Sequence, residues 1–479
     1  MPFDVDYHAI APELILSGTL LLVLAADLVL RPGRKWVSMV LAFLGVAVAL
    51  GVELSLVGQT RSSFGGTYVS GPFAVLFKVF FLSVALVVLL LSLRYFREGR
   101  YYQGEYYFLL LSSFLGMLTI SSSRDLLMLF ISLELVTAPG WLMAAFRKRD
   151  PRSNEAGLKF FLIGILSTAV MLYGMSLVYG VTGSLELRDI ATALEGRAEP
   201  IAIAAVLFVV VGFAFKVSSV PFHFWAPDTY EGSPIPVAAF LSVASKAAGF
   251  VGLLQLMFLG FAPLAEFWAP VFAVLSILTM TIGNLIAIQQ RQIVRLLAYS
   301  SIAQAGYMLL PFALVGGGAD ALAFESAVLY ILIYGVMTLG AFAVVIALSR
   351  EAPGALVSDF AGLGRRAPAL ALSMALFMVS LAGIPPLAGF WAKFRIFQAA
   401  IDAEQAWLAV VMVVNSVISI WYYVGVVRQM YFVQIPEARP LRAPALATGV
   451  AILAAVAVVA VGVYPDLFAR FPPGATLVP

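Results

Sequence analysis

The chain has 479 residues, of which 62% are hydrophobic and 11% charged, with a mean hydropathy of +1.00. Soluble globular proteins are about half apolar and about a quarter charged, so this composition excludes a soluble protein and predicts many membrane spans. The formal net charge of +3 gives no reason to expect nucleic acid as a partner. With no cysteine and 2 histidines, the sequence excludes disulfides and thiolate-bound iron–sulfur clusters and leaves little for a metal or haem site. We therefore do not expect this chain to carry electrons itself.

Apolar stretches of about 20 residues recur along the chain, as expected for helices that cross ~30 Å of hydrocarbon. We predict about fourteen spans and no soluble domain, because the longest polar gap, at residues 182–199, is too short to build a core. A single long bent helix remains an alternative for residues 105–146. The approximate cores of the predicted spans are residues 9–30, 36–58, 72–93, 105–122, 125–146, 155–181, 201–220, 235–260, 268–289, 293–315, 322–348, 368–391, 407–430 and 443–464.

Lysine and arginine gather in alternate gaps between these spans. One set of gaps contains runs such as Arg-Pro-Gly-Arg-Lys and Arg-Lys-Arg-Asp-Pro-Arg, whereas the other set contains only scattered arginines. The positive-inside rule predicts that the basic gaps face the cytoplasm and that both termini lie on the outer side. The gap that contains Asp228 and Glu231 is an exception, because it falls on the cytoplasmic side and carries no basic residue.

Two of the predicted spans combine a lysine with prolines and aromatic residues. The seventh carries Lys216 and Pro221, and the twelfth carries Pro385, Pro386 and Lys393. Proline removes a backbone donor and clashes with the preceding turn, so we expect both helices to be broken. Broken helices in two halves of a chain are typical of inverted-repeat transporters. The offset of five spans fits this arrangement, because an odd offset inverts the second copy.

Charged residues also lie inside apolar spans, where each costs roughly 2.5–3.5 kcal/mol even on a lenient insertion scale. Glu134 lies in the fifth predicted span, Lys216 in the seventh, Lys246 near the centre of the eighth and Lys393 in the twelfth. Burial disfavours the ammonium form of a lysine and a nearby carboxylate favours it, so such a pair can load and unload a proton as a coupled unit. The pattern therefore predicts proton handling.

Each of these residues has a simpler structural explanation. Glu134 could form a structural ion pair, and Lys216 could extend to the cytoplasmic surface, since the proline break follows closely. Lys393 and Arg395 could be interfacial charges on a half-helix. His223, just after the break, could be a hydrogen-bonded core residue.

Four other polar residues are weaker candidates. We expect Lys159 to be an anchor at the interface and Lys78, near the outer end of its span, to extend to the surface. Tyr330 and Tyr334 share one helical face, for which aromatic packing is a better explanation than a polar chain.

Three segments of the sequence together resemble a known family. They are FAFKVSSVPFHFWAPDTYEGSPIPVAAFLSVASKAAGF around Lys216 and Lys246, LELVTAPGWLMAAF around Glu134, and LAGIPPLAGFWAKF around Lys393. They are similar to the antiporter-like membrane subunits of respiratory complex I, the proton-pumping NADH:quinone oxidoreductase. The YEGSP turn and the lysine at position 393 favour the N type over the L and M types and over the large subunits of multi-subunit Na⁺/H⁺ antiporters. The resemblance covers essentially the whole chain.

The resemblance implies an architecture. The fold class is all-α and polytopic, with about fourteen transmembrane helices and two inverted five-helix repeats that each contain a proline-broken helix. In this sequence the first three helices would occupy residues 1–103, the first repeat residues 104–261, the second repeat residues 262–433 and the last helix residues 434–479.

The resemblance also implies roles for individual residues. A proton path would run through Glu134, Lys216, Lys246, Lys393 and His223. The chain would be an enzyme subunit without a redox centre or cofactor of its own, and NADH, FMN, iron–sulfur clusters and quinone would lie in partner subunits. Its partners would be the other membrane and peripheral subunits and the lipid of a bacterial plasma membrane. An antiporter subunit and a purely structural scaffold remain the alternatives.

Overall fold

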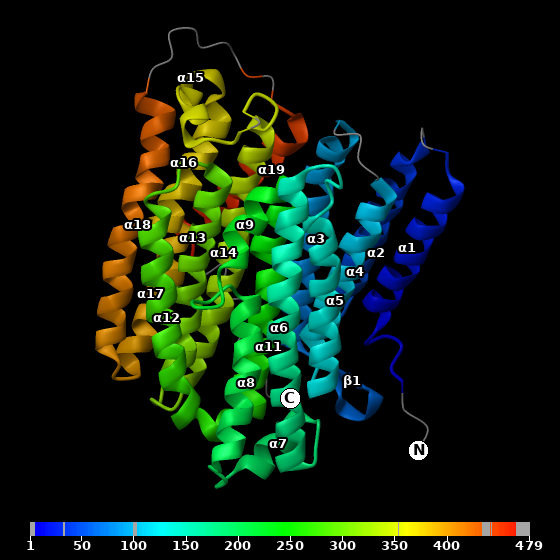
Figure 1. Cartoon of the computed structure of the whole chain (residues 1–479), viewed down its shortest axis with the longest axis vertical. Helices are drawn as coiled ribbons and strands as arrows, with labels where there is room; N and C mark the ends of the chain where they lie inside the picture. Colours follow the sequence, from blue (N-terminus) through cyan, green and yellow to red (C-terminus); the bar gives the residue numbers. More distant parts are fainter. Residues whose placement is uncertain are drawn as a thin grey trace. The chain divides into compact units, whose positions relative to one another are not determined.

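The computed structural model describes residues 5–31, 34–98, 103–352, 354–433, 441 and 443–465. The described chain is built almost entirely of helices, with one short antiparallel hairpin of strands (Figure 1). Eleven described helices are long and apolar enough to cross a membrane, and two shorter apolar helices end at breaks in the chain. The predicted all-α, polytopic fold class is confirmed.

The chain divides into two compact units. The first contains Met1–Val217 and Gly232–Trp268, and the second contains Ser218–Glu231 and most of the chain after Ala269. The helices of the first unit are α1 (Ala11–Val29), α2 (Trp36–Ser55), α3 (Pro72–Glu98), α4 (Gln103–Ser122), α5 (Leu126–Ala144), α6 (Pro151–Thr182), α7 (Leu187–Leu194), α8 (Pro200–Lys216), α10 (Ile235–Phe240) and α11 (Lys246–Gln255). Strands β1 (Arg61–Ser63) and β2 (Tyr68–Ser70) form the hairpin, with Ser62 opposite Val69.

Residues 105–146 form two helices rather than one bent helix. The side chain of Asp125 accepts hydrogen bonds from the backbone of Leu127 and Met128, and it therefore caps the start of α5. Helices α4 and α5 pack closely against each other, because Gly116 has no side chain where a Cβ would lie 2.7 Å from the carbonyl oxygen of Ser132. Two separate helices are therefore present here, as predicted, and α5 is among the candidate membrane spans of the described chain.

The helix that contains α10 and α11 is the centre of the first unit. The span Ile235–Gly260 is buried along most of its length, and it contacts α3, α4, α5 and α8. Two stretches of it, Leu241–Ser245 and Leu256–Gly260, are π-helical. Such π-bulges often occur at functional sites, and the first of them directly precedes Lys246.

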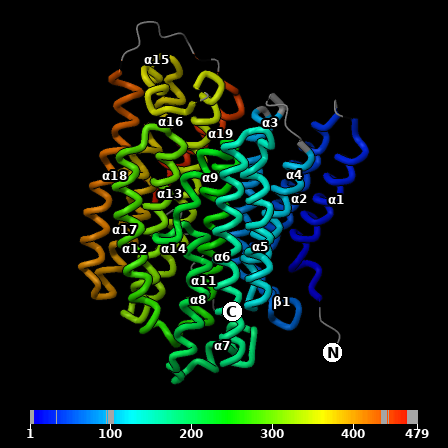
Figure 2. Tube along the Cα trace, viewed as in Figure 1, coloured from blue at the N-terminus to red at the C-terminus, as the bar shows by residue number. Residues whose placement is uncertain are grey.

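The second unit surrounds one long buried helix, α14 (Asp320–Leu348), which contacts α16, α17 and α19. Helix α18, drawn in orange, lies at an edge of this unit in the tube view (Figure 2). The helices of the unit are α9 (Trp225–Gly232), α12 (Ala265–Ala287), α13 (Ile293–Leu309), α14, α15 (Leu363–Arg366), α16 (Pro368–Ala382), α17 (Ala388–Asp402), α18 (Ala406–Phe432) and α19 (Ala445–Val463).

Both predicted helix breaks are present. Helix α8 ends at Lys216 and α9 begins at Trp225, so the seventh span is interrupted around Pro221. The twelfth span is two helices, α16 and α17, rather than one apolar run over 368–391. In both spans the break coincides with proline, as the missing backbone donor requires.

The prediction for Lys78 was wrong. Its side chain is fully buried, and its Nζ lies 2.8 Å from Glu13 Oε1. Because Lys78 lies near the outer end of its span, we predicted that its side chain would extend to the surface. Instead it pairs with a carboxylate of α1 inside the bundle. A buried ammonium ion that is paired does not need to reach water.

The acidic gap that did not fit the charge pattern has a structural explanation. Arg295, on α13, places Nη1 2.8 Å from Asp228 Oδ1 and 2.8 Å from Glu231 Oε2, both on α9. Arg295 belongs to the basic gap Arg-Gln-Ile-Val-Arg. An arginine from a basic gap therefore pairs with the two acidic residues of the gap that lacks basic residues. These ion pairs hold α9 against α13 directly after the break of the seventh span.

We expect Arg295→Gln to lower the free energy of unfolding by about 1–2 kcal/mol, because two partly exposed ion pairs are lost together. The measurement is the apparent melting temperature of the purified protein in detergent. Arg428→Gln is the matched control, since Arg428 is exposed on α18. An Arg295 variant that melts at the same temperature as the Arg428 control would show that these ion pairs do not stabilise the fold.

Candidate functional site

Three of the five predicted site residues, Glu134, Lys216 and Lys246, lie in the first unit. Lys216 is the last residue of α8, is 2% exposed, and donates a 2.6 Å hydrogen bond from Nζ to Thr137 Oγ1 on α5. Because the helix ends here, the negative end of its dipole faces the ammonium group and favours its charge. Lys216 therefore does not extend to the surface, which removes the simpler explanation for its position.

Glu134 precedes Thr137 by one helical turn on α5. Its Oε1 accepts a 2.9 Å hydrogen bond from Thr168 Oγ1 on α6, and its carboxylate is close enough to Lys216 for the two charges to interact. Within the described part of the chain, however, Lys216 has the hydroxyl of Thr137 as its hydrogen-bonding partner and not the carboxylate. The charges of Glu134 and Lys216 therefore interact without direct contact between the two groups. This arrangement differs from the structural ion pair that the sequence left open for Glu134.

Lys246 begins α11 and is 2% exposed. One turn later, Gly249 brings the helix against the end of α8, since a Cβ at this position would lie 2.9 Å from Cγ of Lys216 and 3.0 Å from Cγ1 of Val217. Residues one turn apart share a helical face, so Lys246 lies on the face of α11 that packs against Lys216. The lack of a side chain at Gly249 is what allows this close approach.

Lys393 lies in the second unit, beside the break of the twelfth span. It is 6% exposed, and its Nζ donates a 3.1 Å hydrogen bond to the carbonyl oxygen of Ala382, the last residue of α16. The ammonium also lies 4.4 Å from the centre of the Tyr307 ring, a favourable position for a cation–π interaction. Arg395, by contrast, is partly exposed and pairs with Glu325 at 3.7 Å, so the two charges are not equivalent interfacial anchors.

Buried hydrogen bonds extend beyond Tyr307 through the second unit. The ring of Tyr307 is stacked on that of Tyr330, whose hydroxyl donates to Gln304 Oε1. Nε2 of Gln304 donates to the hydroxyl of Tyr423 at 3.0 Å, and that hydroxyl lies 2.6 Å from Oγ of Ser300. Tyr330 was expected to serve aromatic packing, and it does so while also being part of a polar chain.

His223 lies in the turn between α8 and α9 and is 5% exposed. Its Nδ1 has no hydrogen-bond partner among the residues that the structure describes, and its ring packs against that of Phe224 at a tilt of 32°, with centroids 4.5 Å apart. The break itself is held by Thr279 on α12, whose Oγ1 accepts from the backbone nitrogen of Val220 at 3.0 Å. The turn is therefore fixed while the imidazole remains available.

Sequence reasoning missed the uncharged groups that contact the charged residues, namely the hydroxyls of Thr137 and Thr168 and the ring of Tyr307. Only Thr137 had a local signal, since it follows Glu134 at one-turn spacing in the same apolar span. In the part of the chain that the structure covers, no group of three or more histidine, aspartate and glutamate side chains could hold a metal ion.

Residues 123–419 match a protein family described as NADH:quinone oxidoreductase/Mrp antiporter, TM. Curated relatives have similar lengths. The chain is 39% identical to NADH-quinone oxidoreductase subunit N of Trichlorobacter lovleyi, over 89% of this chain and 88% of the relative. It is 41% identical to NADH-quinone oxidoreductase subunit N of Moorella thermoacetica, over 89% of each chain.

Solved structures show the same fold. A chain of respiratory complex I from Thermus thermophilus with bound aureothin matches with a TM-score of 0.81 and 33% identity, over 95% of this chain and 98% of the other. A chain of the Mrp complex from Dietzia sp. DQ12-45-1b matches with a TM-score of 0.85 over 98% of this chain and 96% of the other. The identity of that second match is 19%, so it supports the fold alone.

We expect Gly383→Ala to destabilise the protein and displace Lys393. Gly383 has a φ of +88°, which costs an L-residue about 1–2 kcal/mol, and a Cβ there would lie 2.7 Å from Cδ of Lys393. Thermal unfolding in detergent should show a lower melting temperature. The matched control is Gly425→Ala, at an open position inside α18, which should be neutral or stabilising. Equal melting temperatures for the two variants would contradict the expectation.

Proposed function

The chain belongs to the family of NADH:quinone oxidoreductase and Mrp antiporter membrane subunits, and from this premise we propose that it translocates protons as the N-type subunit of such an oxidoreductase. The observation that carries the proposal is the pair of buried lysines Lys216 and Lys246, with the half-buried Glu134 close enough to Lys216 for their charges to interact where little water screens them. The relatives at 39% and 41% identity, both named subunit N, support the assignment.

The geometry suggests how the first unit handles a proton. The ammonium of Lys216 is held by the hydroxyl of Thr137, while Glu134 is held by Thr168 and acts on Lys216 from a distance. A small displacement of the carboxylate would change the free energy of the charged lysine, and the proton would pass to Lys246 when that energy rises. Burial disfavours two ammonium ions in one apolar region, so we propose that a single proton moves between Lys216 and Lys246.

The second unit supplies further carriers. Lys393 is stabilised as a cation by the carbonyl of Ala382 and the face of Tyr307, and it would release its proton when another positive charge approaches. Hydroxyl and amide groups from Tyr330 to Ser300 form a hydrogen-bonded chain of the kind that conducts protons. His223, buried with one free ring nitrogen among the described residues, is a further candidate carrier at the break of the seventh span.

The wider organisation is part of the same proposal. Residues 104–261 and 262–433 would be inverted repeats, which the breaks at Pro221 and at Pro385 support. Electron transfer from NADH through FMN and iron–sulfur clusters to quinone would take place in partner subunits. The chain would lie in a bacterial plasma membrane, and the positive-inside rule applied to the basic gaps supports an outer position for both termini.

The alternative is a large subunit of a multi-subunit Na⁺/H⁺ antiporter, because the Mrp chain has the same fold. The two functions differ in their source of energy. Proton movement in the proposed subunit depends on quinone reduction, whereas an antiporter exchanges cations without any electron donor.

We expect Lys246→Ala to reduce quinone reduction and proton pumping together, severalfold, in an assembled complex, because the shared proton loses its central acceptor. NADH oxidation, proton uptake and subunit content are measured in the same membrane vesicles. Lys159→Ala is the control, since Lys159 pairs with Glu155 at the surface of α6. Normal activity of an assembled Lys246 variant would show that this lysine is structural, and Na⁺-driven proton exchange without NADH would favour the antiporter.

We expect Thr137→Val to slow pumping by about tenfold or more, because a hydrogen bond to a charged group contributes about 1.5–3 kcal/mol. Valine keeps the shape of threonine and removes the hydroxyl that accepts from Lys216. Thr182→Val is the matched control, since the hydroxyl of Thr182 bonds to the carbonyls of Val178 and Ser184. Wild-type pumping by the Thr137 variant would exclude this hydrogen bond from the proton path.

A further inference from the structure

A second group of buried ionisable side chains, around the Lys78–Glu13 contact described above, lies in the first unit and shares no residue with the group of Glu134, Lys216 and Lys246. Glu13 on α1, Tyr68 on β2 and Lys78 on α3 form a closed set of contacts. Lys78 Nζ is 2.8 Å from Glu13 Oε1 and donates a 2.6 Å hydrogen bond to the hydroxyl of Tyr68, which in turn donates to Glu13 Oε1 at 2.7 Å. The lysine is fully buried and the glutamate is 6% exposed.

A second carboxyl group faces this set. Glu53, in the last turn of α2, is 0% exposed, and it interacts electrostatically with both Lys78 and Glu13. Neither of its carboxyl oxygens has a hydrogen-bond partner among the described residues. It is therefore a buried acid within electrostatic range of a cation that another carboxylate already contacts.

Charge balance decides the state of Glu53. The cluster contains one ammonium ion and two carboxyl groups, and the ammonium lies against Glu13. An ionised Glu53 would leave one uncompensated negative charge in the interior, which is strongly unfavourable, so the group binds a proton instead. We propose that Glu13, Glu53, Tyr68 and Lys78 form a second proton-binding site, in which Glu53 holds one exchangeable proton.

The other ionisable groups nearby do not compete for this proton. Arg61 donates a hydrogen bond to Asp6 and holds the pKa of that carboxyl below its usual range, so Asp6 stays charged. Helix α4, which also packs against α2, carries its ionisable residues in its first turn, around Gly104, which lies beside Asp27 at the far end of α1.

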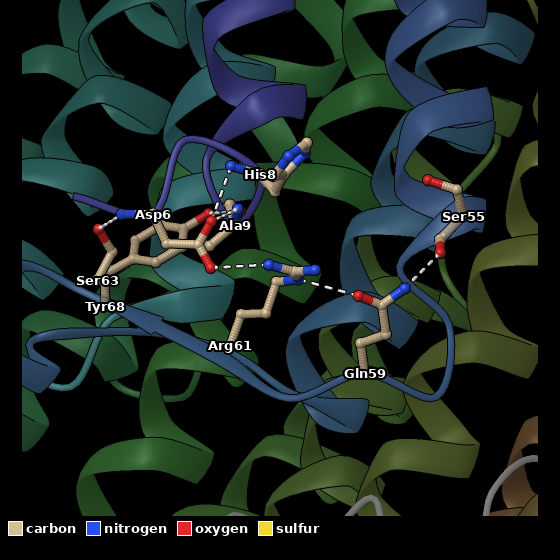
Figure 3. Close-up of polar contacts among 8 residues, drawn as sticks. All are labelled: Asp6, His8, Ala9, Ser55, Gln59, Arg61, Ser63 and Tyr68. Atoms are coloured by element: carbon tan, nitrogen blue, oxygen red, sulfur yellow. Dashed lines mark hydrogen bonds and ion pairs between the residues drawn. The ribbon is translucent and has the colours of Figure 1, made fainter. Parts of the chain in front are cut away.

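The site lies close to one end of its helices. Glu13 is in the first turn of α1, Glu53 in the last turn of α2, and Lys78 follows the start of α3 at Pro72 by about 9 Å along the helix axis. The hydroxyl of Tyr68 also lies 3.1 Å from the carbonyl oxygen of Ala9, and Figure 3 shows Tyr68 together with the contacts that link Asp6, Arg61 and Gln59. A thin polar layer thus separates the acid from the end of the bundle.

Release of the proton is a simple exchange. The O–H bond of Glu53 breaks, the proton leaves towards the end of the bundle where α1 begins, and the carboxylate remains. The ammonium group of Lys78 then interacts with two carboxylates, those of Glu13 and Glu53. The net charge of the cluster changes from zero to −1. Rebinding of a proton reverses the step. This inference does not depend on the proposed function, because it concerns the protonation of the cluster and not its coupling to electron transfer.

The test is infrared difference spectroscopy of the intact complex that contains this chain, comparing wild type with Glu53→Gln. We expect the variant to lose one carbonyl band of a protonated carboxylic acid, and we expect that band to fall reversibly in the wild type as the pH rises. Glu195→Gln, at an exposed position after α7, is the control and should leave the band intact. Absence of a band difference, or a band that does not respond to pH, would overturn the proposal.

A second comparison uses stability. Glu53→Gln replaces a neutral acid by a neutral amide, so the melting temperature and assembly of the complex should be preserved. Glu13→Gln removes the carboxylate from a buried ammonium ion and should lower both. If Glu53→Gln is as destabilising as Glu13→Gln, Glu53 is an ionised partner of Lys78 and holds no proton.

Discussion

The fold depends on one constraint, which is that a polar group inside hydrocarbon must find its partner within the protein. Long helices satisfy this requirement for the backbone, and the breaks are tolerated where side chains take over. At the seventh span the hydroxyl of Thr279 accepts a hydrogen bond from the backbone nitrogen of Val220. At the twelfth span Lys393 donates a hydrogen bond to the carbonyl oxygen of Ala382, which the break leaves without a helical partner. The charged residues and the breaks thus stabilise each other, which explains why they occur together in the sequence.

Two kinds of buried lysine follow from the same constraint. Lys78 is in direct contact with a carboxylate and a phenol, which together satisfy its charge. Lys216 contacts a neutral hydroxyl, and its nearest acid acts at longer range. A tight ion pair resists a change of charge, whereas a looser arrangement allows the charge to depend on small movements. We propose that this difference separates a lysine that carries a proton from one that holds a neighbouring acid in place.

Much of the fold could be predicted from the sequence. Apolar length located the helices, and proline located both breaks. The separation of α4 from α5 was expected from a short polar sequence, and the structure shows that Asp125 in this sequence caps α5. These features are local, because helix propensity and the missing donor of proline act within a few residues. The prediction for Lys78 failed because its partner Glu13 belongs to another helix, and distance from the end of a span carries no information about it.

The sequence by itself determined that this chain is a multi-pass helical membrane protein with acids and lysines inside its spans, since hydropathy and charge are properties of single residues and their neighbours. Only the tertiary structure decided which partner each charge has. In the folded chain Lys216 donates to Thr137, and Arg295 pairs with Asp228 and Glu231. Glu53 has no hydrogen-bond partner among the described residues, and the lysine near it is already paired with Glu13. These pairings join helices that are distant in the chain, and a contact of this kind is set by how the helices pack, not by the order of the residues.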